Sequence, residues 1–118
     1  MRALIGLTAA LSLFGAQAQA QTAETKADIR CIATLASVGA EDPDAMPAVT
    51  IAVMFFMGRI DGRQPNLDLT AALAVEAASL EGQDLQREAE RCGRIIVEKG
   101  EALKRIGAQL QALPAPKE

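Results

Sequence analysis

The sequence predicts a small all-α protein, because helical spacing of apolar residues, helix caps and a heptad pattern recur along the chain. Four segments after residue 20 place apolar residues three or four positions apart, which is the period of a helix with one buried face. Each segment begins near an Asp or Thr suited to N-capping and ends near a Gly or Pro. We therefore predict a bundle of four helices, or of five if the long last helix breaks.

The first 20 residues have the features of a secretory signal peptide. Arg2 is followed by an apolar or small run over residues 3–14, and then by alanines at alternate positions before Gln21. The run is too short to span a bilayer, and an A-x-A pattern is typical of a cleavage site. We predict that residues 1–20 are removed and that the protein is periplasmic, with an uncleaved membrane anchor as the alternative.

The rest of the chain is long enough for one small domain, which we place at residues 21–112, followed by an extended tail at residues 113–118. Of 12 basic side chains only Arg2 lies in the leader, whereas all 15 acidic side chains follow it, so the exported chain has a net charge of −4. An acidic protein is a poor partner for nucleic acid or anionic lipid. No later segment is apolar enough over a sufficient length to predict a membrane span, so we expect no membrane contact after leader removal.

The two cysteines predict a disulfide between the first and last helices. Cys31 and Cys92 are 61 residues apart and the chain has no His, so they form neither a C-x-x-C redox motif nor an ordinary zinc site. Export exposes them to oxidising conditions. Free or intermolecular thiols are the alternative.

The first helix is expected over residues 26–38. Thr25 is positioned as its N-cap, Cys31 lies on its apolar face, and Gly39 is placed to terminate it.

The second helix is expected after Asp44 as N-cap, with Pro47 in the first turn and Asp61-Gly62 at the end. Over residues 48–57 only Thr50 is polar, which predicts a helix buried on nearly all sides at the centre of the bundle. A strand is the competing interpretation, but the length and the caps favour a helix.

The third helix is expected between Asp68 as N-cap and Gly82, with an apolar stripe made of Leu69, Leu73, Ala77 and Leu80.

The fourth and longest helix is expected over residues 84–112. Its apolar residues alternate spacings of four and three, the pattern of a heptad seam, with Lys99 as the only polar member; the seam consists of Leu85, Ala89, Cys92, Ile96, Lys99, Leu103, Ile106, Leu110 and Leu113. A helix of this length exceeds a compact domain of this size. It therefore breaks at Lys99-Gly100-Glu101, overhangs to form a homodimer, or overhangs and is covered by the first helix.

Glycines recur beside this seam at intervals of seven residues. Each weakens a helix interior by about 0.5–1 kcal/mol, so we predict that they allow another helix to approach closely. The expected neighbour is the second helix, which carries two glycines of its own. The predicted helix-packing glycines are Gly58, Gly62, Gly93, Gly100 and Gly107.

The residues that usually carry catalysis are scarce, because the chain lacks His, Tyr and Trp and its cysteines are expected to pair. We therefore predict no enzyme, no catalytic residue, no metal site and no cofactor. The remaining candidate is a surface that binds another protein, for which ordinary core packing and surface salt bridges are the alternatives. Its residues are Met54, Phe55, Phe56, Met57, Arg59, Arg63 and Arg94.

The layout of the chain resembles two groups of small periplasmic proteins. The shared features are export, an all-helical chain, Cys31 in the first helix, Cys92 in the last, and the segment FFMGRIDGR between them. The chain is similar in this layout to the HdeA/HdeB acid-stress chaperones and, in outline, to the Tai-type immunity proteins that neutralise periplasmic toxins. The resemblance implies a disulfide-bonded helical fold without enzymatic activity.

Two functional hypotheses follow, with a third behind them. A periplasmic interaction protein of the inhibitor or immunity type would bind one protein at neutral pH. An acid-activated holdase would bind many clients only at low pH, where protonation of the carboxylates leaves a strongly positive chain. A carrier of a small apolar ligand would need a cavity in the bundle.

Overall fold

The computed structural model describes residues 21–116, which form four α-helices and one 3-10 turn and contain no strand. The helices are α1 (Ala23–Glu41), α2 (Met46–Arg63), α3 (Leu69–Ser79) and α4 (Leu85–Gln111), with the 3-10 turn η1 (Pro43–Ala45) between α1 and α2. A disulfide joins Cys31 of α1 to Cys92 of α4. The predicted all-α fold and its disulfide are therefore confirmed, whereas the predicted leader lies outside the described residues.

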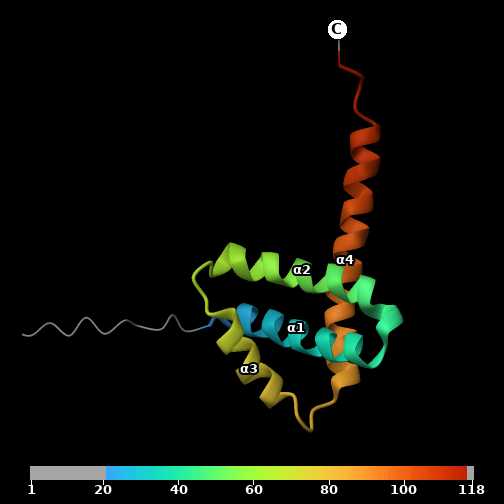
Figure 1. Ribbon diagram of the computed structural model, residues 1–118. Coiled ribbons are helices and arrows are strands. Elements are labelled where there is room, and N and C mark those ends of the chain that lie inside the picture. Colours follow the sequence, from blue (N-terminus) through green and yellow to red (C-terminus); the bar gives the residue numbers. More distant parts are fainter. Residues whose placement is uncertain (1–20, 117–118) are drawn as a thin grey trace, which may run out of the picture.

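Helix α1 is the centre of the arrangement. Helices α2 and α3 pack along it on different sides, and α4 runs past it and continues beyond the other helices (Figure 1). The core lies where α1 meets the other three, and its buried members are Ile29, Cys31, Ile32, Phe56, Ile60, Ala72 and Cys92. A domain of this size has one small core, so much of each outer helix faces solvent.

Helix α1 is longer at both ends than the sequence predicted. Thr22 is its N-cap, accepting a hydrogen bond from the backbone N–H of Thr25 over 3.1 Å. Thr25 lies one turn inside and is fully buried. Gly39 does not end the helix; it is buried where α1 passes closest to the start of α2, and a Cβ at this position would lie 2.6 Å from the sulfur of Met46.

Helix α2 begins as expected, with Pro47 in the first turn, but Asp42 rather than Asp44 caps the turn before it. The helix ends at Arg63, just beyond the predicted Asp61-Gly62.

The expectation that α2 is buried on all sides is wrong. One face packs on α1 through Val49, Ala52, Phe56 and Ile60, and the opposite face is open to solvent. The segment Pro43–Arg63 is also long and apolar enough to cross a membrane, by length and composition alone. We expected no such segment after the leader, and a core helix of a soluble protein can have the same length and composition.

Helix α3 starts at its predicted cap, Asp68, and α4 starts one residue after the predicted Asp84, which is its cap. Asp68 accepts a hydrogen bond from the Ala71 N–H, and Asp84 accepts one from the Arg87 N–H, each over 3.0 Å. After α3, the chain turns through Gly82, whose φ of +73° is a left-handed conformation suited to glycine.

Helix α4 is continuous, so the predicted break at Gly100 does not occur. Its first half packs on α1, where Cys92 is buried and Ile95 and Ile96 are half-buried. From Val97 to Gln111 it contains no buried residue, and this half projects from the body on the side of α2 (Figure 1). At 1.5 Å per residue the projection is about 22 Å long.

The glycine prediction is wrong for contacts within the described chain. A Cβ added at Gly58, Gly62, Gly93, Gly100 or Gly107 would meet no atom within 4 Å. The physical reason is the course of α4, which packs on α1 near the disulfide and does not lie along α2. The glycines therefore do not serve contact between α2 and α4.

Candidate functional site

Each outer helix is tied to α1 by at least one charged contact, and the contact with α2 is the most deeply buried. The Asp28 carboxylate of α1 is 1% exposed and lies between two cations of α2. Arg59 Nε is 3.0 Å from Asp28 Oδ2, and Arg63 bonds the same oxygen. Arg63 Nε also donates to the Thr25 hydroxyl over 3.4 Å. These two arginines therefore hold α2 against α1.

The contact with α3 is built around Glu76, whose side chain is 4% exposed. Lys26 Nζ lies 3.7 Å from one carboxylate oxygen and an Arg30 guanidinium nitrogen lies 3.6 Å from the other. Ser79 donates its hydroxyl hydrogen bond back into the same turn, to the Glu76 carbonyl and carboxylate. A buried carboxylate is retained only when it is paired in this way.

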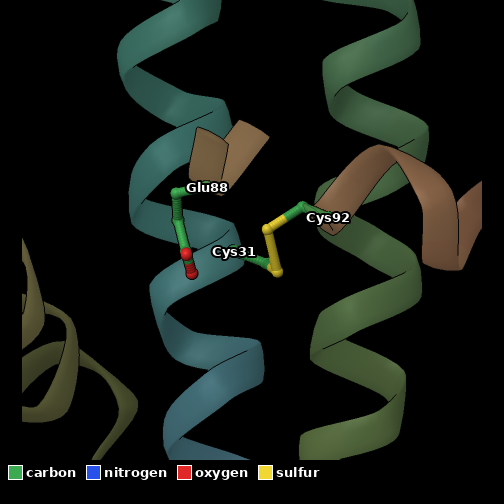
Figure 2. Close-up of side chains that lie close together, drawn as sticks. All are labelled: Cys31, Glu88 and Cys92. Atoms are coloured by element: carbon green, nitrogen blue, oxygen red, sulfur yellow. A yellow bond between two sulfur atoms is a disulfide. The ribbon is translucent and has the colours of Figure 1, made fainter. Parts of the chain in front are cut away.

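The contact with α4 surrounds the disulfide. Figure 2 shows Glu88 of α4 on one side of the Cys31–Cys92 bridge. Arg91 binds the Glu88 carboxylate over 2.5 Å and donates to the Ala27 carbonyl of α1 over 3.0 Å. The hydrogen bond from Arg91 lowers the pKa of Glu88 below its ordinary value, against an opposing effect of burial, and the Arg91 charge and then that of Arg30 add to the lowering.

The same place contains the one group of potential metal ligands among residues 21–116, namely Cys31, Glu88 and Cys92. A cysteine binds a metal as a thiolate. Both sulfurs here are consumed by the bond between them, so this group binds no metal while the disulfide is intact.

The structure separates the residues that the sequence grouped as an interaction surface. Phe56 is fully buried, and Phe55 is half-buried with its ring edge-on to Phe56 at 5.2 Å between centroids. Arg59 stacks over both rings, at 5.5 Å and 5.8 Å. Phe55, Phe56, Arg59 and Arg63 therefore belong to the contact between α2 and α1. Core packing and salt bridges were the stated alternatives to an interaction surface for these residues. Arg94 lies apart on α4, exposed and without an ion-pair partner among residues 21–116.

Two members of that group, Met54 and Met57, lie on the open side of α2 and form part of a larger apolar surface. We call it the methionine face. Its side chains are exposed by 39% to 70%; they are Met46, Ile51, Met54 and Met57. Ile51 and Met54 lie opposite the buried face of the helix, whereas Met46 lies at the edge of the surface, where its sulfur is next to Gly39 of α1. Gly58 and Gly62 lie on the same side of α2, and a Cβ added at either position would meet no atom within 4 Å. No side chain therefore projects from the helix at these two positions beside Met54 and Met57.

A second open apolar surface lies on the projecting half of α4. We call it the distal seam, and it consists of Lys99, Leu103, Ile106, Leu110 and Leu113. Its four aliphatic side chains are exposed by 51% to 69%. The first helix does not cover the overhang, so this alternative for α4 is wrong for the described residues.

Two hollows of the surface lie between helices. One of about 420 Å³ is lined mainly by small or apolar residues of α1 and α3: Ile32, Ala33, Ala36, Ser37, Ala40, Leu73 and Ala77. A neighbouring one of about 290 Å³, between α1 and the start of α4, includes Thr34. The hydroxyl of Thr34 is buried and has no hydrogen-bond partner. Ser37 of α1 lines both hollows.

Comparison with known proteins gives no relative. No family model, curated protein or solved structure matches the chain. Function must therefore be argued from the surfaces described above.

The carboxylates that connect α1 to its neighbours, Asp28, Glu76 and Glu88, were not predicted from the sequence. Asp28 lies four residues before Ile32 and seven before Leu35, so it falls on the apolar stripe of α1. Glu76 falls between Leu73 and Leu80 on the stripe of α3, where the analysis placed Ala77 instead. An acidic residue in register with buried apolar positions was the available signal, because it requires a cation from another element.

Proposed function

We propose that this chain is an exported, non-enzymatic protein-interaction module that binds another protein through the methionine face of α2. The observation that carries the proposal is the exposure of Ile51 and Met54, by 70% and 66%, in a helix whose opposite face is fully engaged with α1. A contiguous apolar surface of this kind is typical of a contact site on a small soluble domain.

The chemistry of the surface favours a protein partner. Thioether side chains are flexible and polarisable, and they adapt to apolar side chains of a partner. The charged residue on this side of α2 is Asp61, which is exposed and lies one turn beyond Met57, whereas Arg59 and Arg63 are engaged with Asp28. We infer a partner that presents aliphatic or aromatic side chains in a shallow, mainly apolar contact.

The cell compartment and the absence of catalysis are part of the same proposal. The disulfide is consistent with an oxidising compartment, and the signal-peptide pattern of residues 1–20 points to the periplasm. The chain has no His, Tyr or Trp, and the buried carboxylates Asp28 and Glu76 are engaged in ion pairs. An inhibitor or immunity role, with one partner at neutral pH, fits these features.

The test is a crosslinking pull-down of the tagged, exported chain at pH 7, with partners identified by mass spectrometry. Met54→Glu and Ile51→Glu place a charge in the methionine face, and Val75→Glu, at an equally exposed aliphatic position of α3, is the matched control. We expect one stoichiometric partner, lost with either α2 variant and retained with the control. A partner that survives both α2 variants would refute this surface as the binding site.

A second candidate, an acid-activated holdase, is favoured by the charged contacts of α1. Each contact with another helix depends on a carboxylate: Asp28 for α2, Glu76 for α3 and Glu88 for α4. In strong acid the chain as a whole becomes strongly positive, and this self-repulsion destabilises the compact state. Loosened helices would expose Phe56 and Ile60 while the disulfide keeps α1 and α4 joined.

The same pull-down at pH 3 separates the two candidates. A holdase would capture a broad set of proteins in acid and none at pH 7, and it would suppress light scattering by an unrelated acid-denatured protein. A single partner at pH 7 with no gain in acid would exclude it.

A further inference from the structure

The distal seam of α4 is covered by nothing in the described chain. Leu103 and Leu110 are 69% and 62% exposed, and Ile106 between them is 51% exposed. Their spacings of three and four place them on one stripe of the helix. An exposed helix with such a stripe, projecting about 22 Å from its domain, is arranged to pair with another helix.

We propose that a second copy of this chain covers the distal seam, forming a dimer through an antiparallel pair of α4 helices. The proposal goes beyond the proposed function and does not depend on it, because the methionine face lies on α2. The four aliphatic side chains of the seam are 51% to 69% exposed and expose on the order of 500 Å² per copy, the range in which an apolar patch marks a contact. Two such seams bury at most about 1,000 Å² in total, which is the minimum expected of a specific dimer.

The charge of Lys99 determines the orientation. A parallel pair places the two Lys99 side chains in the same layer of the seam, where like charges repel. An antiparallel pair with full overlap sets each Lys99 against Leu110 of the other copy. The lysine stem then packs along the leucine while its ammonium group reaches solvent. The antiparallel arrangement also keeps the two α1 bodies at opposite ends of the pair.

The glycines beside the seam acquire a role in this dimer. Gly100 and Gly107 directly follow the seam positions Lys99 and Ile106, and neither has a neighbour within 4 Å in one copy. On the other flank the corresponding positions are Ala102 and Gln109. Coiled coils usually carry charged residues on these flanks. Small, uncharged flanking residues allow the two α4 backbones to approach more closely. The packing gained in this way offsets the cost of placing glycine in a helix.

The proposal is tested with the purified full chain alone, by sedimentation equilibrium over a wide concentration range at pH 7. We expect a monomer–dimer equilibrium. Leu103→Glu combined with Leu110→Glu should weaken it by tenfold or more, whereas Ala108→Glu, on the opposite face of the same helix, should leave it unchanged. Lys99→Leu should tighten it. Circular dichroism and intact-mass measurement of the disulfide establish that each variant is folded.

The orientation is tested with spin labels at Gln111→Cys, attached after the native disulfide has formed. An antiparallel pair places the two labels on the order of 20 Å or more apart, and a parallel pair places them at about the interaxial distance of 10 Å. A monomer at every concentration, a dimer that tolerates both seam substitutions, or a short label distance would each overturn the proposal. A Met54→Glu chain should dimerise normally, so failure here is separable from failure of the proposed function.

Discussion

Asp28 of α1 and Arg63 of α2 form an ion pair whose carboxylate is 1% exposed, while the guanidinium side chain is 31% exposed. The pair therefore spans from the core to the surface. Arg59 reaches the same carboxylate oxygen over 3.0 Å and stacks on the two phenylalanine rings beside it. A single acidic side chain thus organises the position of the last two turns of α2.

Asp28→Asn should destabilise the fold more than any surface charge substitution. It removes the negative charge but keeps the shape, so two arginines lose their partner at the edge of the core. Breaking a buried pair on one side costs about 3 kcal/mol, and urea denaturation at pH 7 measures the loss. Asp61→Asn, at an exposed acid of the same helix but outside this contact, is the control and should change stability by less than about 0.5 kcal/mol.

Glu88→Gln should destabilise the protein at neutral pH and have little effect in acid. The folded pKa of Glu88 is lower than in the unfolded chain, chiefly because of the hydrogen bond from Arg91. The ionised carboxylate therefore stabilises the fold above its unfolded pKa, and the contribution is lost as the pH falls through the folded pKa. We expect a loss of about 1 kcal/mol at pH 7. Denaturation of both proteins at pH 7 and pH 3 tests it, and an equal difference at both values would contradict the assignment.

Local signals predicted local structure well. Asp68 was identified as an N-cap because a cap depends only on the next three residues, and the start of the last helix was placed at Asp84, which is its N-cap. The disulfide was predictable because two distant cysteines in a chain without His leave few alternatives. Gly39 was wrongly predicted to end α1, because in a sequence a glycine that allows two helices to approach closely looks the same as one that ends a helix.

Interhelical geometry was not predictable from the same signals. The apolar composition of α2 indicated burial on all sides, but only α1 is available to cover it, so Met54 remains open. The glycine repeat of α4 indicated close packing, but the crossing of α4 over α1 near Cys92 carries Gly100 away from the body. Such crossings depend on which helices compete for the core, and the apolar pattern within each segment does not indicate which of them will pack together.

Removal of the disulfide should release α4 from the body. Within residues 21–116, α4 has its main contact with α1, around Cys92 and Arg91. Closing a loop with a sequence separation of 61 residues stabilises a fold by about 4 kcal/mol on the chain-entropy estimate. Cys31→Ser with Cys92→Ser should lower stability by that order. Hydrogen exchange should show the largest loss of protection in residues 85–96, because α4 can then also detach locally; a loss there no greater than in the other helices would contradict the release of α4.

Two glycine substitutions of the same kind should differ in their effect on stability. Gly100→Ala adds a methyl group where no atom lies within 4 Å, so it should stabilise the monomer by about 0.5–1 kcal/mol through helix propensity. Gly39→Ala adds one 2.6 Å from the Met46 sulfur and 3.3 Å from a Val49 methyl. The thioether can move, but the valine is buried, so the gain should be cancelled or reversed. Thermal denaturation at low concentration, where self-association is absent, measures both.

Phe56→Ala and Met54→Ala test whether α2 has one buried and one open face. Phe56 is fully buried against α1, so its truncation leaves a cavity and should cost about 3–5 kcal/mol. Met54 is 66% exposed two positions away on the same helix, so its truncation should change stability by less than about 0.5 kcal/mol. Urea denaturation of both variants gives the two values under identical conditions. A large cost at Met54 would mean that another helix covers the methionine face in solution, and the protein-binding surface proposed for α2 would then have to be abandoned.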